Sequence, residues 1–311
     1  MAATERVAIV GSGLIGRAWA IVFSSGGCDV TLYDGVVGVA QAAHALVGEG
    51  LAELEAQGLI ADARAAAARV RAVASLNDAL DGATFVQENT PETVEAKRAI
   101  FAELDRLAAP DAILASSTST IVASKFTEHL KGRHRCLVAH PVNPPHLVPL
   151  VELVAAPWTA PEIVDRAKAI YEAVGQVPIV VKKEIDGFIL NRLQAVLLAE
   201  AFRLTGEGYV TPQDLDKTLK DGLGLRWSFM GPFETIELNA PGGIADYCRR
   251  YGPSFVQLAK SRPEIFEGEG LTRILAQWGE APKPDRVAAR MRWRDKRLAA
   301  LKAHKRGQPE R

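Results

Sequence analysis

Cysteine is scarce in this chain of 311 residues, and its three copies, Cys28, Cys136 and Cys248, lie far apart. An odd number of cysteines in no metal-ligand spacing predicts reduced structural thiols and no metal site. Net charge is also absent, because 37 lysines and arginines balance 37 aspartates and glutamates. No overall field therefore favours binding to nucleic acid or to an anionic membrane surface.

Long hydrophobic runs are missing as well. Hydrophobic residues make up 48% of the chain, yet no uninterrupted run approaches the roughly 20 residues that span a bilayer. The start, MAATERVAIVGSG, carries an acid and a base within six residues and lacks the layout of a signal peptide. We expect a cytoplasmic protein without membrane contact. The length is large for one compact core, so we expect two domains.

A glycine pattern near the start predicts a dinucleotide site. A strand over residues 6–10 runs into Gly11, Gly13 and Gly16, in the order G-x-G-x-x-G, and a helix over residues 14–24 and a strand over residues 28–33 follow. The glycines permit a tight turn, close approach of a pyrophosphate and close packing of helix on strand. Asp34 ends the second strand, where its carboxylate can accept hydrogen bonds from a ribose diol and would repel a 2′-phosphate. The predicted cofactor is NAD, bound by Gly11, Gly13, Leu14, Ile15, Gly16 and Asp34.

Strands and helices then alternate, which predicts a parallel, doubly wound sheet of the Rossmann type. Residues 36–74 read as two alanine-rich helices, and further strands are expected at 83–86, 112–115, 136–139 and 178–181. Polar residues follow the ends of these strands, where open parallel sheets bind ligands. We expect a Rossmann domain over residues 1–185. The alternation stops after Lys182, and residues 186–311 are expected to form an all-α domain that begins with a long helix at 187–207.

The stretch RCLVAHPVNPPHLVPLVELV, residues 135–154, is predicted to carry the acid–base chemistry. His140 ends an apolar strand before a proline-rich turn, and Glu152 is the only acid in the strand that resumes at Leu147. An antiparallel return would bring the carboxylate beside the imidazole and make a general acid–base pair. The alternative is a polar turn with an isolated, half-exposed histidine.

Taken together, the motifs GSGLIGR, LYD, ENTPE, SSTST, HPVNPP, LVELV, GFILNRLQ and LGLRWSFMGPFET resemble the 3-hydroxyacyl-CoA dehydrogenase family, and within it the lambda-crystallin branch, whose members act as L-gulonate 3-dehydrogenases. The resemblance runs from the glycine loop to about residue 250. It implies His140 as catalytic base with Glu152 as its partner, and Ser119 and Asn191 on the substrate oxygens. It also implies Glu92 and Lys97 beside the cofactor, and Asn143 in contact with the nicotinamide or the substrate. It also implies a homodimer through the helical domain.

Several of these residues have a plainer interpretation. Ser119 could cap a turn and Asn191 its own helix, although strand-end placement together with His140 favours the substrate roles. Lys97 could belong to a solvated helix face.

The substrate prediction depends on cations. Residues 35–72 contain no lysine, whereas relatives of the family that bind coenzyme A have lysines in these helices to hold its phosphates. Arg226, in GLGLRWSFMGP, can grip a carboxylate through two parallel hydrogen bonds or form a salt bridge inside or between subunits. We expect NAD-dependent oxidation of a small free hydroxy acid at C3, with L-gulonate favoured. Two other substrates are possible, L-carnitine and 3-hydroxybutyryl-CoA. For the trimethylammonium group of L-carnitine, the nearby aromatic residues are Trp227 and Phe229. A non-enzymatic NAD-binding structural role is a further alternative. The tail from Lys302 is expected to be frayed and solvated.

Overall fold

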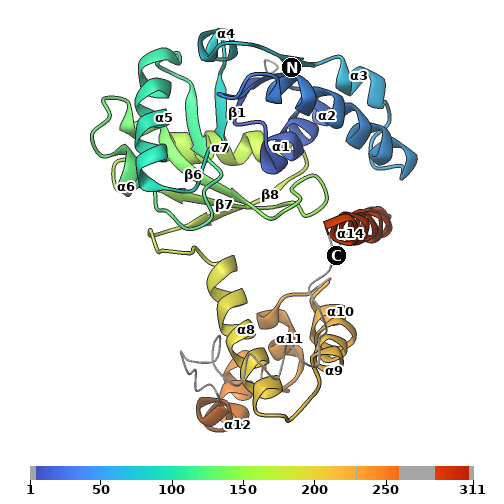
Figure 1. Ribbon diagram of the computed structural model, residues 1–311. Coiled ribbons are helices and arrows are strands. Elements are labelled where there is room, and N and C mark those ends of the chain that lie inside the picture. Colours follow the sequence, from blue (N-terminus) through green and yellow to red (C-terminus); the bar gives the residue numbers. More distant parts are fainter. Residues whose placement is uncertain (1–4, 229, 242, 259–283, 308–311) are drawn as a thin grey trace. The chain divides into compact units, whose positions relative to one another are not determined.

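The computed structural model describes residues 5–228, 230–241, 243–258 and 284–307 (Figure 1). The chain divides into two compact units, one of Met1–Ile189 with Asp285–Arg311 and one of Leu190–Pro284. The first boundary thus lies a few residues beyond the expected position at 185. The segment from Asp285 onwards groups with the first unit rather than with the helical one.

An eight-stranded sheet forms the centre of the first unit, in the order β3-β2-β1-β4-β5-β6-β7-β8. Its strands are β1 (Arg6–Val10), β2 (Asp29–Tyr33), β3 (Val70–Ala72), β4 (Phe85–Glu88), β5 (Ile113–Ser116), β6 (Cys136–Pro141), β7 (Leu150–Ala155) and β8 (Val177–Val181). All neighbouring pairs are parallel except β6 and β7. The doubly wound sheet expected from the alternation of strands and helices is confirmed.

Helices cover both faces of this sheet because its strands are apolar on both sides. They are α1 (Leu14–Ser25), α2 (Val39–Ala56), α3 (Ala63–Ala67), α4 (Leu76–Leu80), α5 (Val94–Leu107), α6 (Ser124–Thr127) and α7 (Pro161–Ala173), with a short 3-10 turn at Arg133–Arg135. One core packs Trp19 of α1, Leu51 of α2 and Tyr171 of α7 against the sheet. The other packs Phe101 of α5 and Phe126 of α6, whose ring centroids are 4.8 Å apart.

Three parts of this unit differ from the sequence expectations. Residues 70–72 form the edge strand β3 inside a stretch expected to be helical throughout, and α4 is an additional short helix. The helix α14 (Pro284–Arg306) replaces the frayed tail expected from Lys302. Lys302 donates to the carbonyl of His146 over 2.9 Å, and Arg306 donates to the carbonyl of Leu59 over 2.6 Å. These bonds hold the C-terminal helix to the first unit.

The second unit is helical in every element that the structure describes. It contains α8 (Leu190–Gly206), α9 (Pro212–Lys217), the π-helix η2 (Thr218–Leu223), α10 (Gly224–Trp227), α11 (Pro232–Leu238) and α12 (Gly243–Leu258). The N-terminus of α9 is capped, because the Thr211 hydroxyl accepts from the Asp214 amide over 3.2 Å and Pro212 occupies the first helical position. Across the described residues no helix is long and apolar enough to cross a membrane.

Candidate active site

The glycine loop between β1 and α1 has the geometry of a phosphate cradle. Gly11 has a φ of 92°, and a Cβ there would lie 2.7 Å from the carbonyl oxygen of Asn89. A Cβ on Gly16 would lie 2.0 Å from the carbonyl oxygen of Gly11. The space around Gly13 is open, and no side chain of the described residues caps the helix N-terminus that it begins. The first amides of α1 therefore remain available to an anion.

Asp34 lies at the end of β2 and is tied to this loop. Its carboxylate accepts hydrogen bonds from the Ser12 amide over 2.8 Å and from the Val36 amide over 2.9 Å. These two bonds fix both carboxylate oxygens, and each keeps a further lone pair for a ribose hydroxyl. Loop and acid together fit the adenosine half of a dinucleotide.

The predicted acid–base residues are neighbours in the sheet. β6 and β7 are antiparallel and place His140 directly opposite Glu152. The imidazole Nδ1 lies 2.7 Å from Glu152 Oε2, and both side chains are buried. If Glu152 is ionised, it holds the imidazole proton on Nδ1 and leaves the lone pair on Nε2. No group among the described residues hydrogen-bonds to that nitrogen.

Two further residues, which the sequence did not indicate, hold this pair. The amide of Ile189 donates to Glu152 Oε1 over 2.8 Å. The fully buried ring of Phe188 lies 5.4 Å from the imidazole, measured between ring centroids. Phe188 has a φ of 51°, a left-handed conformation that is unusual for a bulky residue and costs about 1–3 kcal/mol. A positive φ leaves no signal in a hydrophobicity pattern. Residues 187–189, expected to begin the long helix, therefore form a turn instead, and α8 begins at Leu190.

Glu92 connects the loops that follow β4 and β5. One of its oxygens, Oε1, accepts from the Thr118 hydroxyl over 2.6 Å and from the amides of Ser119 and Thr120 over 2.7 and 3.1 Å. Ser119 is exposed at the carboxyl end of the sheet, as expected. Glu92 thus holds the loop that carries Ser119, while its second oxygen has no partner among the described residues.

Lys97 lies inside the protein rather than on a solvated face. Its side chain is 1% exposed, and its ammonium donates to both oxygens of the buried Glu88 over 2.8 and 3.0 Å and to the Thr90 carbonyl over 2.9 Å. An ammonium has three hydrogen-bond donors, and all three are used. This arrangement favours a structural role for Lys97 in holding the loop after β4. Direct contact with the cofactor remains a prediction from the family resemblance.

The remaining predicted residues are spread over both units. Asn143 is exposed in the turn after β6, three residues beyond His140. Asn191 is the second residue of α8, and Arg226 belongs to α10, so both lie in the second unit. Arg226 is half-buried, and its guanidinium forms no ion pair or hydrogen bond with a residue that the structure describes. Phe229 lies outside the described residues.

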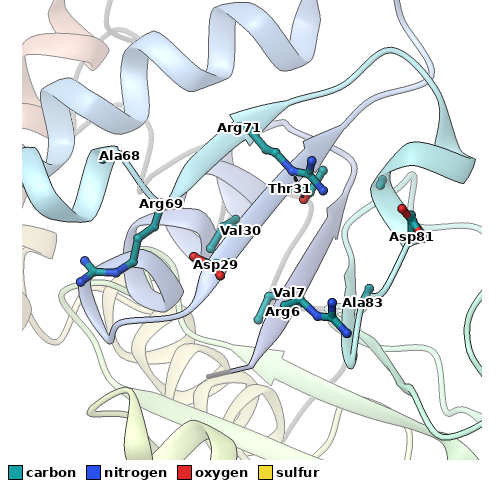
Figure 2. A pocket seen from close by; sticks show the side chains of 11 residues that line it. Arg6, Val7, Asp29, Val30, Thr31, Ala68, Arg69, Arg71, Asp81 and Ala83 are labelled. Atoms are coloured by element: carbon teal, nitrogen blue, oxygen red, sulfur yellow. Dashed lines mark hydrogen bonds between the residues drawn. The ribbon is translucent and has the colours of Figure 1, made fainter. Parts of the chain in front are cut away.

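A separate cavity of about 250 Å³ opens at the amino ends of β1 and β2 (Figure 2). Three arginines and two aspartates contribute to its lining, namely Arg6, Arg69, Arg71, Asp29 and Asp81. The glycine loop and His140 follow the carboxyl ends of the strands. Since parallel strands place all their amino ends at one edge and all their carboxyl ends at the other, this cavity is not the candidate active site.

Buried thiols take no part in the chemistry. Burial raises the pKa of the Cys136 thiol to about 12 and that of Cys28 to about 11, so both stay protonated near neutral pH. Among the described residues no group of three His, Cys, Asp or Glu side chains could hold a metal ion. The hydrogen-bonded pair of His140 and Glu152 is the candidate for acid–base chemistry at the carboxyl ends of the strands.

A doubly wound sheet with a glycine loop, an acid after the second strand and a histidine at a strand end defines an NAD-dependent oxidoreductase. The chain belongs to the 3-hydroxyacyl-CoA dehydrogenase family. The model of the NAD-binding domain of 3-hydroxyacyl-CoA dehydrogenase matches residues 6–185, and the model of its C-terminal domain matches residues 187–279. NAD is the cofactor, as expected from Asp34.

Curated relatives extend over almost the whole chain. A lambda-crystallin homolog from Bos taurus is 46% identical, and the match covers 95% of this chain and 95% of the relative. The lambda-crystallin of Oryctolagus cuniculus is 43% identical, and the match covers 95% of this chain and 96% of the relative. An L-carnitine dehydrogenase from a Pseudomonas species is 38% identical over 94% of this chain and 92% of its own length.

Solved structures have the same fold. An NAD⁺-dependent dismutase, the 5-dehydrogenase of 5-formyl-3-hydroxy-2-methylpyridine 4-carboxylic acid, has a TM-score of 0.84 at 28% identity, covering 98% of this chain and 100% of its own. The (S)-3-hydroxybutyryl-CoA dehydrogenase of Ralstonia eutropha has a TM-score of 0.68 at 26% identity, and the match covers 88% of this chain and 94% of that enzyme.

Proposed function

We propose that this protein uses NAD to oxidise the 3-hydroxyl group of a small free hydroxy acid, with L-gulonate, oxidised to 3-dehydro-L-gulonate, as the favoured substrate. The observation that carries the proposal is the contact of 2.7 Å between His140 Nδ1 and Glu152 Oε2. It leaves the other imidazole nitrogen able to accept a proton at the carboxyl end of the sheet.

Oxidation of a secondary alcohol removes a proton from oxygen and a hydride from carbon. Bound NAD supplies the hydride acceptor. His140 Nε2 takes the proton as the carbonyl forms, and Glu152 stabilises the imidazolium through Nδ1. Because Phe188 and the Ile189 amide restrain the pair, the imidazole keeps its orientation. In the reverse direction the same nitrogen returns the proton to the carbonyl oxygen.

Other side chains orient the reactants. Ser119 and Asn191 would hold the substrate oxygen on which charge develops. Glu92 holds the Ser119 loop through one oxygen, and its other oxygen can face the cofactor together with Asn143. The cytoplasm is the compartment we propose, supported by free cysteines at 28, 136 and 248.

A free acid is favoured over an acyl-CoA ester by the distribution of cations. The segment that contains α2 and α3 has no lysine that could meet the phosphates of coenzyme A. Arg226 has a guanidinium without a partner among the described residues, and such a group can bind a carboxylate through two parallel hydrogen bonds. The identity of 43–46% to lambda-crystallins also supports the branch of the family that acts on free acids.

L-Carnitine is the second candidate, because the Pseudomonas L-carnitine dehydrogenase is 38% identical to this chain. Carnitine carries a carboxylate that Arg226 could bind equally well. It also carries a trimethylammonium group, which proteins usually enclose with several aromatic rings. Trp227 is 41% exposed beside Arg226, and aromatic residues make up only 6% of the chain. L-Gulonate therefore remains the favoured substrate.

An NADH absorbance assay over L-gulonate, L-carnitine, 3-hydroxybutyrate and 3-hydroxybutyryl-CoA tests the proposal. We expect turnover of free acids, with L-gulonate giving the highest kcat/KM. His140→Gln should lower kcat about 100- to 10,000-fold, the usual contribution of a general base, while NAD affinity stays unchanged in a fluorescence titration. Arg226→Ala should lower kcat/KM on free acids about 10- to 100-fold, since a hydrogen bond to a charged group contributes about 1.5–3 kcal/mol.

Each alternative has its own outcome in that assay. Highest activity on 3-hydroxybutyryl-CoA would overturn the free-acid assignment. No turnover of any of the four compounds, with NAD binding intact, would favour the NAD-binding structural role. An unchanged kcat/KM in the Arg226→Ala enzyme would remove the carboxylate role from this residue.

A further inference from the structure

A network of polar side chains lies where β4 and β5 end, apart from the pair of His140 and Glu152. The Trp19 indole Nε1 donates to the Ser117 hydroxyl over 2.9 Å, and Gln87 Nε2 donates to the same hydroxyl over 2.7 Å. The Ser117 hydroxyl donates to Asn89 Oδ1 over 2.7 Å, and Asn89 Nδ2 donates to the carbonyl of Gln87 over 2.9 Å. The Tyr171 hydroxyl donates to Gln87 Oε1. The network thus joins α1 and α7 to the ends of β4 and β5.

The fixed donors and acceptors of this network determine the direction of every bond. An indole N–H only donates, and a backbone carbonyl only accepts. Because Asn89 gives an N–H to the Gln87 carbonyl, its oxygen faces Ser117 and takes the single hydroxyl proton. Gln87 must then donate to Ser117 and accept from Tyr171. Burial raises the pKa of Tyr171 well above its ordinary value, so this hydroxyl keeps its proton. The Asn89 carboxamide therefore has one orientation.

Asn89 borders the loop that fits the dinucleotide phosphates. Its amide donates to the carbonyl of Val10 over 2.7 Å, and its carbonyl oxygen is the atom that a Cβ on Gly11 would meet at 2.7 Å. The bond from Trp19 to Ser117 places the network on the face of the sheet that α1 covers. This helix begins at the glycine loop. Asn89 thus contacts the glycine loop through its backbone and the loop after β5 through its side chain.

The order of the sheet assigns Asn89 to one half of the dinucleotide. β1 has β2 on one side and β4 on the other, and a dinucleotide bound at such a switch point extends over both sides. Asp34 follows β2 and fits the adenosine half, so the nicotinamide half belongs over β4 and β5. Asn89 directly follows β4 and is half-buried, whereas Gln87 is fully buried. One N–H and one oxygen lone pair of the Asn89 carboxamide have no partner in the part of the chain that the structure describes.

We propose that Asn89 is a further cofactor-binding residue whose carboxamide hydrogen-bonds to the ribose of the nicotinamide half of NAD, and that Ser117 is a positioning residue that orients this carboxamide. A ribose hydroxyl both donates and accepts, so it matches the remaining N–H and lone pair of Asn89. Ser117 acts through Asn89, because its only proton goes to Asn89 Oδ1. The inference depends on NAD as the cofactor and not on which hydroxy acid is oxidised.

The test is calorimetric binding of three ligands to the full-length protein. NAD and ADP-ribose both contain the second ribose, whereas ADP ends at its diphosphate. The variants are Asn89→Ala, Ser117→Ala and the double variant of the two. Ser24→Ala is the matched control, because it removes a buried hydroxyl of α1 that bonds to the Ile21 carbonyl and takes no part in the polar network. Thermal unfolding of each protein is measured in parallel.

We expect Asn89→Ala to weaken the binding of NAD and of ADP-ribose about 2- to 12-fold, the size of one net hydrogen bond between neutral groups. Its affinity for ADP should stay at the wild-type value. Ser117→Ala should weaken the same two ligands by up to the same factor, because the carboxamide is then free to rotate. The double variant should bind ADP-ribose as Asn89→Ala does, since Ser117 has nothing left to orient. Ser24→Ala should bind all three ligands like the wild type.

Three results would overturn the inference. An unchanged affinity of Asn89→Ala for ADP-ribose would remove the contact with the ribose. An equal loss for ADP and ADP-ribose would mean that the substitution only deforms the glycine loop. A further loss of ADP-ribose affinity in the double variant would mean that Ser117 does not act through Asn89. Should Asn89→Ala not fold, Ser117→Ala decides with the same ligands, and only a loss for ADP-ribose without a loss for ADP supports the inference.

Discussion

Replacing Lys97 should lower the free energy of unfolding more than replacing a lysine on an exposed helix face. The Lys97 ammonium and the carboxylate of Glu88 are buried together, with side chains 1% and 0% exposed. Glu88 also accepts from the Ser116 hydroxyl over 2.6 Å, so the pair connects α5 with the ends of β4 and β5. A buried ion pair adds little net stability over apolar residues, but breaking one leaves an uncompensated charge inside the protein.

Lys97→Met is therefore expected to destabilise the protein by about 3–5 kcal/mol in urea unfolding. The double variant Glu88→Gln with Lys97→Met removes both charges and should lose clearly less than the sum of the two single variants. A double variant whose loss equals that sum would show that the two charges do not depend on each other. The exposed ion pair of Lys217 and Asp214 is the control, and Lys217→Met should leave the urea midpoint close to that of the wild type.

The sequence predicted residues whose chemistry is local and missed those that depend on distant partners. The glycine loop, Asp34 and the antiparallel return that joins His140 to Glu152 follow from motif and strand order, and the structure has all of them. For Lys97 the sequence offered a place beside the cofactor or a solvated helix face, and the buried pair was missed because its partner Glu88 lies on another element. Phe188 adopts a positive φ that no residue pattern signals.

At the scale of elements, short or irregular pieces were missed. β3 has only three residues and lies in an alanine-rich stretch, and it becomes a strand because it pairs with the edge of β2. The π turn before Arg226 has the same residue types as an α-helix, so hydrophobic periodicity cannot separate the two. α14 has little apolar periodicity among its charged residues, and it is held by Lys302 and Arg306 instead.

Through Lys302, α14 makes the stability of the protein depend on pH in the alkaline range. Burial, and secondarily the charge of Arg306, lowers the pKa of Lys302 below its ordinary value of 10.5. Between the folded-state pKa and 10.5 the unfolded chain binds more protons than the folded one. The contribution of Lys302 to stability must then rise with pH in this window, and it is flat at lower pH, where the lysine is charged in both states.

Urea unfolding of the wild type and of Lys302→Met, repeated from neutral pH towards 10.5, measures this effect. The wild type should gain stability relative to the variant as pH rises. The raised pKa values of Cys28 and Cys136 lower stability at high pH, but they cancel in the difference because both proteins contain these thiols. A difference that stays constant with pH would mean that Lys302 is not buried against the first unit.

At the scale of the whole molecule, two helices of the second unit carry large apolar side chains that are exposed. On α8, Leu193, Val196 and Leu197 are 66%, 68% and 38% exposed, and they lie three and four residues apart on one face. On α12, Tyr251, Phe255 and Leu258 are 45%, 51% and 69% exposed at similar spacing. Contiguous apolar faces of this kind mark protein interfaces. They support the proposed homodimer through this unit.

Light scattering coupled to size-exclusion chromatography tests the dimer. The wild type should elute as a dimer, and the double variant Leu193→Glu with Val196→Glu should shift to a monomer, because charges at the centre of an apolar interface are left unpaired when it forms. Leu46→Glu is the matched control, since Leu46 is an exposed leucine of α2 at 41%. It should remain dimeric. NAD binding should be the same in all three proteins, because it depends on the glycine loop and Asp34. A wild-type monomer, or a dimer that survives the double substitution, would require another role for the α8 face.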